Sequence, residues 1–242
     1  MARRGDVLLI DDVADADLVR RLRTLPGLRV VRAATPDAVR RLANLPEYAF
    51  RVALISADFP IPALEDAIEP LRQRFDEGDL VGVVFGDRPT PEAGEHLEQM
   101  GFTLTLWRPF DDHTLRFQMN RAFLRGRRMG AARTELRVPM DCRATISGGH
   151  RSKEAFVYSL SRHGAFLATP RPSATGARVD VSLLLPERSL SIPARVVHTN
   201  VPGNLQRACA PIGMGVRFLD PSPHVQLELD RIVETRNRSL LV

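Results

Sequence analysis

The hydrophobic positions in the first half of the chain form five short runs, separated by segments with a helical pattern. The runs are Val7–Ile10, Leu28–Val31, Val52–Ile55, Val81–Phe85 and Phe102–Leu106. Uninterrupted short apolar runs are typical of strands that are buried on both faces of a parallel sheet. Between the runs, Thr35-Pro36 and Thr90-Pro91 predict helix starts in which threonine caps and proline takes the first helical position. With a last helix from about Asp112 to Leu124, the order is (βα)5, which predicts a doubly wound parallel α/β sheet.

In the second half of the chain, short strand-like runs are separated by turn residues, without helical segments between them. Its strand-like runs lie at 137–146, 155–158, 164–167, 179–185, 192–197 and 213–219. The turn signals include Ser147-Gly148-Gly149, Arg171-Pro172, Thr175-Gly176 and Pro202-Gly203-Asn204. Short strands separated by frequent turns are typical of a small antiparallel β-barrel. A terminal helix is predicted to begin near Ser222-Pro223, and its apolar stripe would close or flank the barrel.

Charge is distributed unevenly along the chain. Residues 1–122 carry 16 basic and 20 acidic side chains, a net charge of −4, whereas residues 123–242 carry 18 and 9, a net charge of +9. Together with the change of pattern, this asymmetry predicts a first domain at 1–122, an arginine-rich linker at 123–132 and a barrel domain at 133–242.

Two cysteines, Cys142 and Cys209, are too few for a disulfide framework or a four-thiolate zinc site. No apolar run is long enough for a membrane span, and the amino terminus lacks the apolar core of a signal peptide. We therefore expect a soluble, cytoplasmic protein.

Chemistry-bearing residues follow the strands predicted in the first half. Asp11 and Asp12 follow the first run, Gly86 follows the fourth, and Arg108-Pro109 follows the fifth. With this arrangement, about 120 residues resemble the receiver domain of two-component response regulators. The resemblance implies an acidic pair that holds Mg²⁺, an aspartate phosphoacceptor after the third strand, a hydroxyl after the fourth and a lysine after the fifth. Gly86 and Arg108 depart from the last two of these.

The phosphoacceptor position is also altered. Counting back from Pro60 places Ser56 there, whereas counting from Pro62 would select Asp58. We prefer Ser56, because the third apolar run ends at this residue. A serine without an adjacent base is a poor phosphoacceptor, and a glycine after the fourth strand has no side chain to bind a phosphoryl oxygen. We expect a pseudo-receiver that acts as a docking or dimer surface, with weak Mg²⁺ binding by the acidic pair left open.

A run of arginines crosses the boundary between the two predicted domains. From Arg121 to Arg137 it holds six arginines, two glycines and one acidic residue. Within it, Arg133-Thr-Glu-Leu-Arg137 spaces two guanidinium groups so that both can grip phosphate. Arginine is so frequent that about four Arg-x-x-x-Arg pairs are expected by chance. The alternative interpretation of the run is a solvated joint.

A second motif, Ser159-Leu-Ser161-Arg-His-Gly164, follows a predicted barrel strand. With Arg133 and Arg137 ahead of the first barrel strand, residues 131–235 resemble a PilZ domain, the bacterial receptor module for cyclic di-GMP. The resemblance implies that the arginines contact guanine and phosphates, that an acid or amide holds a guanine edge, and that a serine reaches phosphate. Ser159 stands where the acid or amide belongs, and losing a bidentate contact costs about 1–3 kcal/mol.

The candidate cyclic di-GMP site therefore comprises Arg133, Arg137, Ser159, Ser161 and Gly164. In the alternative without a ligand, the two serines are ordinary hydroxyls at a strand edge and Gly164 is a turn residue with a positive φ.

Two function classes follow from these motifs, and neither is catalytic. The first is a cyclic di-GMP-responsive effector that acts on a protein partner of a signalling or motility pathway. The second is a ligand-independent adaptor in which both domains are degenerate and dock partners. A nucleic-acid partner is disfavoured, because no recognition helix or base-stacking aromatic array appears in the basic half. We expect no enzyme activity, no cofactor and no metal site, since the six histidines are scattered and no nucleophile elbow surrounds His163. Homo-oligomerisation is left open.

Overall fold

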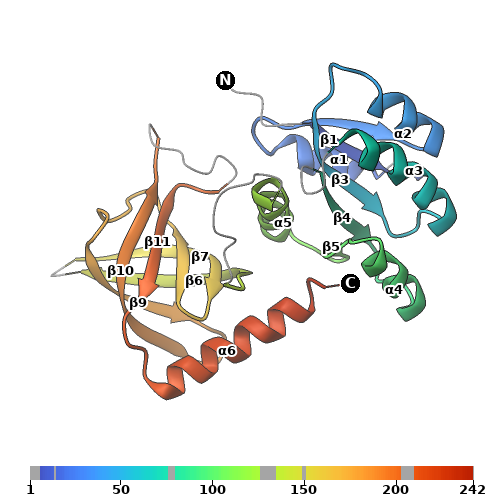
Figure 1. Ribbon diagram of the computed structural model, residues 1–242. Helices are drawn as coiled ribbons and strands as arrows, with labels where there is room; N and C mark the ends of the chain where they lie inside the picture. The colour runs from blue at the N-terminus through green and yellow to red at the C-terminus, as the bar shows by residue number, and fades with distance from the viewer. Residues whose placement is uncertain are drawn as a thin grey trace. The chain divides into compact units, whose positions relative to one another are not determined.

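The computed structural model describes residues 6–13, 15–75, 80–125, 135–148, 151–202 and 210–241. The chain divides into two compact units, one of residues 1–131 with 240–242 and the other of residues 132–239 (Figure 1). The predictions for Arg133, for Cys209, for the arginine run over 126–134 and for the turns at Gly149 and 203–204 lie outside the described residues. No helix in the described ranges is long and apolar enough to cross a bilayer.

A parallel five-stranded sheet forms the centre of the first unit, with the strand order β2-β1-β3-β4-β5. Its strands are β1 (Asp6–Ile10), β2 (Arg29–Ala33), β3 (Phe50–Ser56), β4 (Val81–Gly86) and β5 (Leu104–Trp107). The helices are α1 (Ala16–Arg23), α2 (Pro36–Ala43), α3 (Ile61–Arg74), α4 (Pro91–Gln99) and α5 (Asp112–Arg125). The predicted doubly wound fold is confirmed. In such sheets, the carboxyl ends of the strands on either side of the β1–β3 switch point form the natural site.

Helices cover both faces of this sheet (Figure 1). On β1, Leu8 and Ile10 pack in the buried cluster with α2, α3 and α4, whereas Val7 and Leu9 pack in the cluster with α1 and α5. Successive side chains of a strand point to opposite faces, so a strand covered on both sides must be apolar at every position. This explains the uninterrupted runs in the sequence.

Two helices begin as the Thr-Pro pairs predict. Thr35 Oγ1 accepts a hydrogen bond of 3.2 Å from the Ala38 N–H, and Thr90 Oγ1 accepts one of 3.4 Å from the Ala93 N–H. Proline follows each cap in the first turn, where its missing N–H would have no partner in any case. The predicted starts of α2 and α4 are confirmed.

The second unit is a closed antiparallel barrel with the strand order β10-β11-β8-β7-β6-β9, in which β10 pairs with both β11 and β9. The strands are β6 (Val138–Gly148), β7 (Arg151–Ser161), β8 (Gly164–Ala168), β9 (Arg178–Leu184), β10 (Ser189–Asn200) and β11 (Gly213–Phe218). Helix α6 (Pro223–Arg238) follows and contacts β6 and β7. The predicted barrel and terminal helix are confirmed, although β7 and β10 begin several residues before the apolar runs that predicted them.

Candidate functional site

The five residues of the predicted degenerate receiver site lie at one edge of the parallel sheet. Asp11 and Asp12 follow β1, Ser56 is the last residue of β3, Gly86 is the last residue of β4, and Arg108 follows β5. Parallel strands bring all their carboxyl ends to the same edge, so the fold gathers these positions. The structure also shows what each of them does there.

The side chain of Asp11 builds the loop that leads into α1. Its Oδ1 accepts a hydrogen bond of 3.1 Å from the Val13 N–H, and its Oδ2 accepts one of 2.9 Å from the Asp15 N–H. Asp11 is only 2% exposed, whereas Asp12 is exposed. Arg32 on β2 donates hydrogen bonds of 2.8 and 3.0 Å to the carbonyl oxygens of Asp11 and Asp12. The loop is thus fixed by the Asp11 carboxylate and by Arg32 from the neighbouring strand.

These residues do not fit the Mg²⁺ ion that the receiver resemblance implies. Mg²⁺ requires oxygen ligands in near-octahedral geometry and is usually held by carboxylates. Both oxygens of Asp11 accept backbone hydrogen bonds, and Ser56 offers a neutral hydroxyl at the end of β3. No group of three or more His, Cys, Asp or Glu side chains within the described ranges is arranged to hold a metal ion.

Ser56 and Asp58, the two alternatives for the phosphoacceptor, differ in position. Ser56 is buried, and its Oγ accepts a hydrogen bond of 3.3 Å from the N–H of Asp58. Asp58 is exposed in the turn that follows β3. Gly86 adopts a φ of +132°, and a Cβ atom there would lie 3.3 Å from Ala57 Cβ and 3.8 Å from Asp58 Oδ2. The backbone conformation at Gly86 therefore disfavours the serine or threonine that a receiver carries after β4.

Arg108 is bonded to the start of α1. Its Nη2 donates a hydrogen bond of 2.8 Å to Asp15 Oδ2, and this bond raises the pKa of Arg108. Burial alone would raise the pKa of Asp15, but hydrogen bonds from the Leu18 N–H and from Arg108 lower it overall. Sequence reasoning missed Asp15, although an aspartate directly before an amphipathic helix is a recognisable cap signal.

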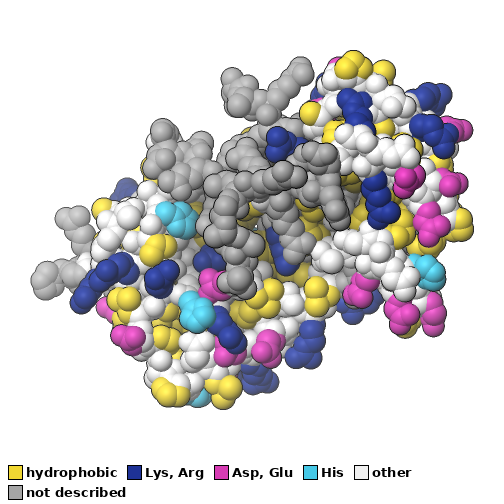
Figure 2. All heavy atoms as spheres, viewed as in Figure 1, with side chains coloured by type: hydrophobic (Ala, Val, Ile, Leu, Met, Phe, Trp, Pro, Cys, Tyr) yellow, Lys and Arg dark blue, Asp and Glu magenta, His cyan; other side chains and the backbone are white. Residues whose placement is uncertain are grey.

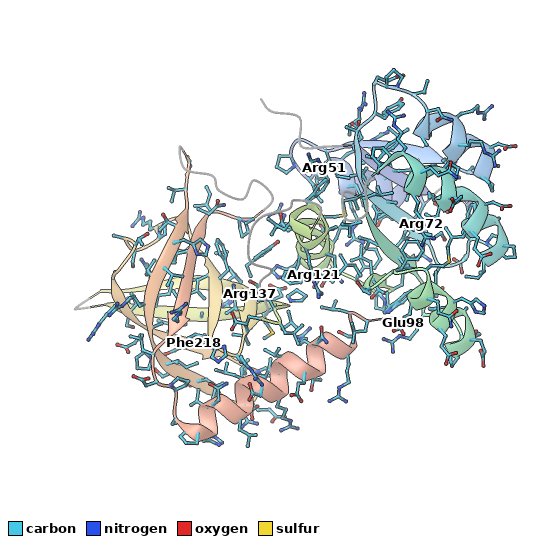
Figure 3. All side chains as sticks on the ribbon, in the orientation of Figure 1. Arg51, Arg72, Glu98, Arg121, Arg137 and Phe218 are labelled. Carbon is cyan, nitrogen blue, oxygen red and sulfur yellow. The ribbon has the colours of Figure 1, made fainter. Side chains whose placement is uncertain are left out.

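In the barrel unit, Arg137 directly precedes β6 and is labelled in Figure 3. Ser159 and Ser161 end β7, and Gly164 begins β8. Ser159 is 4% exposed and Ser161 is completely buried. The Ser161 hydroxyl lies 3.0 Å from the carbonyl oxygen of Gly164 and donates to it across the turn. The described part of the predicted ligand site thus lies around the β7–β8 turn and the residue that enters β6.

The expectation of a positive φ at Gly164 is wrong. The positive-φ glycines are Gly27, Gly86, Gly101 and Gly176 among the described residues. Gly164 instead pairs with Arg217 on β11, and a Cβ atom there would lie well inside van der Waals contact with the Val216 carbonyl oxygen. The glycine is needed because β8 and β11 approach closely, and not because of a turn conformation.

Glu135 connects the segment before β6 to the β7–β8 turn. Its Oε1 accepts a hydrogen bond of 3.1 Å from the His163 N–H and another of 3.0 Å from His163 Nδ1. Its Oε2 lies 3.8 Å from Arg137 Nη2. Burial alone would raise the pKa of Glu135, but the Ser161 hydroxyl, the charge of Arg137 and the His163 bonds lower it overall. Sequence reasoning did not assign Glu135, although it is the one acidic residue in the arginine run.

Further contacts connect the β7–β8 turn to α6 and β11. Arg162 Nε lies 3.1 Å from Asp230 Oδ1 on α6, and Gln226 Nε2 donates a hydrogen bond of 3.4 Å to the Arg162 carbonyl oxygen. The N–H of Phe218, at the end of β11, donates a hydrogen bond of 2.9 Å to the carbonyl oxygen of His163. The turn is therefore fixed by α6 and β11, while Glu135 accepts hydrogen bonds from the backbone N–H and Nδ1 of His163.

Basic and acidic side chains are mixed among the described residues on the face that Figure 2 draws. On the face drawn in Figure 2, Lys and Arg side chains are scattered among Asp and Glu side chains in both units. Proteins that follow a nucleic-acid backbone gather Lys and Arg on one face or stripe. The described side chains on this face do not form such a stripe.

Comparison with protein families identifies the second unit. Residues 131–235 match the family model described as "PilZ domain". The C-terminal region of the chain is therefore a PilZ domain. No curated protein matches the chain.

Solved structures resemble each unit separately. For the PilZ region, the inhibitor of motility MotI/DgrA from Bacillus subtilis has 18% identity and a TM-score of 0.37, and the match covers 45% of this chain and 53% of that protein. The PilZ domain of YcgR from Escherichia coli with c-di-GMP has 19% identity and a TM-score of 0.35, covering 45% of this chain and 94% of that domain. The Vibrio cholerae chemotaxis protein CheY4 has 20% identity and a TM-score of 0.41, covering 49% of this chain and 98% of that protein. The chain thus spans about half the length of MotI/DgrA.

Proposed function

We propose that the chain is a bacterial signalling regulator whose PilZ domain binds cyclic di-GMP through Arg133, Arg137, Ser159, Ser161 and Gly164. One observation carries this proposal: Arg137 and the Ser161–Gly164 turn, which are far apart in sequence, face the same carboxylate group of Glu135. A place where a guanidinium, an imidazole nitrogen and a backbone N–H face one anion is suited to a phosphate.

Electrostatics favour a dianionic dinucleotide at this place. Residues 123–242 carry a net charge of +9, which attracts an anionic ligand during its approach. A charge-assisted hydrogen bond from an arginine to a phosphate contributes about 1.5–3 kcal/mol. Arg133 and Arg137 would therefore supply much of the binding energy that a roughly micromolar ligand needs, which is about 8 kcal/mol.

The first unit would act as a docking module without phosphotransfer or other catalysis. Ser56 at the end of β3 carries a hydroxyl, and Gly86 at the end of β4 has a positive φ. Arg108, which follows β5, is bonded to Asp15. Phosphotransfer to an aspartate requires a carboxylate nucleophile and groups that stabilise the charge on the phosphoryl oxygens. The regulator would act in the cytoplasm by contacting a protein partner of a signalling or motility pathway.

A second candidate is a ligand-independent adaptor, which Ser159 favours. This serine takes the position of the acid or amide that holds a guanine edge, and it is buried. One hydroxyl cannot replace a bidentate acceptor, so affinity for a guanine dinucleotide would fall about 5- to 150-fold.

Titration of the full chain with cyclic di-GMP by isothermal calorimetry distinguishes the two candidates. Saturable binding that is lost in Arg137→Ala supports the effector. If titration of the wild type and of Ser159→Asp gives only the heat of dilution, neither binds the ligand, and the adaptor is supported. Arg178→Ala, which removes an exposed arginine on β9, provides the control for a non-specific charge effect.

A further inference from the structure

The carboxylate of Glu135 accepts hydrogen bonds from the β7–β8 turn and faces Arg137, a residue of the proposed ligand site. Its Oε1 accepts from the backbone N–H and from Nδ1 of His163 at 3.1 and 3.0 Å. Its Oε2 lies 3.8 Å from the guanidinium of Arg137. An internal anion at this place holds the donors in position while no ligand is bound.

We propose that Glu135 is an intramolecular competitor for the anion site, which a phosphate-containing ligand must displace before it can bind Arg137 and the β7–β8 turn. The inference rests on the proposed function, because it concerns the same site. It adds a regulatory residue: Glu135 sets the affinity and keeps the site closed to weakly held anions.

The surrounding contacts indicate which partner must move. The β7–β8 turn is bonded to α6 through Arg162 and to β11 through the His163 carbonyl oxygen, so displacing the turn would break several hydrogen bonds. Glu135 lies outside any helix or strand, and its side chain is 29% exposed. The carboxylate can therefore rotate into solvent, where water replaces its hydrogen-bond donors.

Competition of this kind has a defined energetic consequence. A ligand that displaces Glu135 exchanges one set of charge-assisted hydrogen bonds for another, so only the difference contributes to affinity. The displaced carboxylate also stays close to the bound phosphates and repels them. Neutralising Glu135 removes both effects and is expected to tighten anion binding at least tenfold, which corresponds to about 1.4 kcal/mol.

The experiment compares the full-length wild type with Glu135→Gln by calorimetry, using cyclic di-GMP and inorganic pyrophosphate as separate probes. Pyrophosphate carries phosphate charge without guanine, so it reports on the anion site alone. Glu154→Gln is the matched control, because Glu154 is an exposed glutamate on β7 of the same unit. Glu135→Asp, which keeps the charge and shortens its reach, is a second variant with a smaller expected gain.

Glu135→Gln is expected to bind both probes at least tenfold more tightly than the wild type, while Glu154→Gln binds them as the wild type does. Unchanged affinity of Glu135→Gln for both probes would overturn the inference. If both affinities are unchanged and the wild type binds cyclic di-GMP, the ligand site stands and the competition is refuted. If pyrophosphate binding tightens while no protein binds cyclic di-GMP, the competition stands and the proposed ligand is wrong.

Discussion

Arg108 Nη2 lies 2.8 Å from Asp15 Oδ2, so the basic side chain that follows β5 is joined to the cap of α1. Asp15 Oδ1 also accepts a hydrogen bond of 2.8 Å from the Leu18 N–H. The pair therefore couples β5 to the first helix at the edge where a receiver would carry out its chemistry. An arginine used in this way is a structural element of the fold.

The ion pair predicts a dependence of stability on pH. The folded-state pKa of Asp15 is below the ordinary value of 3.8, so the ionised group stabilises the fold above that pH, and this contribution is lost as the pH falls through the folded pKa. Asp15→Asn keeps the cap acceptor but removes the charge. We expect its deficit in unfolding free energy to be largest near neutral pH and to shrink below about pH 4, measured by urea unfolding.

Asp37→Asn is the control for this prediction. Asp37 pairs with Arg40 at 2.6 Å on an exposed helix face, where such pairs contribute little. A deficit of Asp15→Asn that stays constant from neutral to strongly acidic pH would show that the charge of Asp15 does not stabilise the fold.

The protein is expected to resist phosphorylation by acetyl phosphate in the presence of Mg²⁺. The strand-three position is Ser56, and neither Gly86 nor the Asp15-bonded Arg108 offers the usual assistance to a phosphoryl group. Intact-mass spectrometry measures the outcome. A stoichiometric gain of one phosphoryl group that disappears in Asp58→Asn would refute both the choice of Ser56 and the pseudo-receiver.

Gly164→Ala is expected to destabilise the barrel by about 1–3 kcal/mol or more, because the added methyl group meets the Val216 carbonyl oxygen of the neighbouring strand. Gly148→Ala is the matched control in the same unit, since the nearest atom to its Cβ would be 3.7 Å away. Urea unfolding measures both. Equal stability of the two variants would contradict the close approach of β8 and β11.

The sequence predicts the elements of this fold well where local chemistry decides them. Thr35 and Thr90 mark the starts of α2 and α4 because their own hydroxyls cap these helices. The apolar runs of the sheet are recognisable because its strands are buried on both faces. The starts of β7 and β10 were missed because exposed polar residues such as Ser152, Glu154 and Ser189 alternate with buried ones there.

The site was less predictable because its geometry depends on contacts between distant segments. Glu135 is hydrogen-bonded to His163, 28 positions further along the chain, and Arg108 is hydrogen-bonded to Asp15, 93 positions away. Gly164 looked like a turn residue because its partner on β11, Arg217, is 53 positions away, and a local sequence pattern does not reveal this pairing. Residue types alone indicate which groups can bind an anion, but the fold decides which of them meet.

Ser159→Asp separates ligand recognition from folding. A carboxylate at this position restores the bidentate acceptor for a guanine edge and is expected to tighten cyclic di-GMP binding by about 1–3 kcal/mol. Because Ser159 is 4% exposed, the same charge is costly without the ligand, and the melting temperature of the unliganded variant should fall. Calorimetry and thermal unfolding measure the two effects. A drop in melting temperature without any gain in affinity would make Ser159 a structural residue only.

The central claim is that the PilZ domain binds phosphates through Arg133 and Arg137. It is tested most directly by calorimetric titration of the wild type and of Arg133→Ala/Arg137→Ala with cyclic di-GMP at low and physiological salt. We expect roughly micromolar binding by the wild type that weakens as salt rises, because exposed parts of the contact are screened over about 8 Å. The double variant should show no binding and an unchanged melting temperature, since the side chain of Arg137 is 24% exposed and partly exposed ion pairs contribute little to the fold. Binding by the double variant that equals the wild type, or no binding by the wild type even at low salt, would contradict the claim.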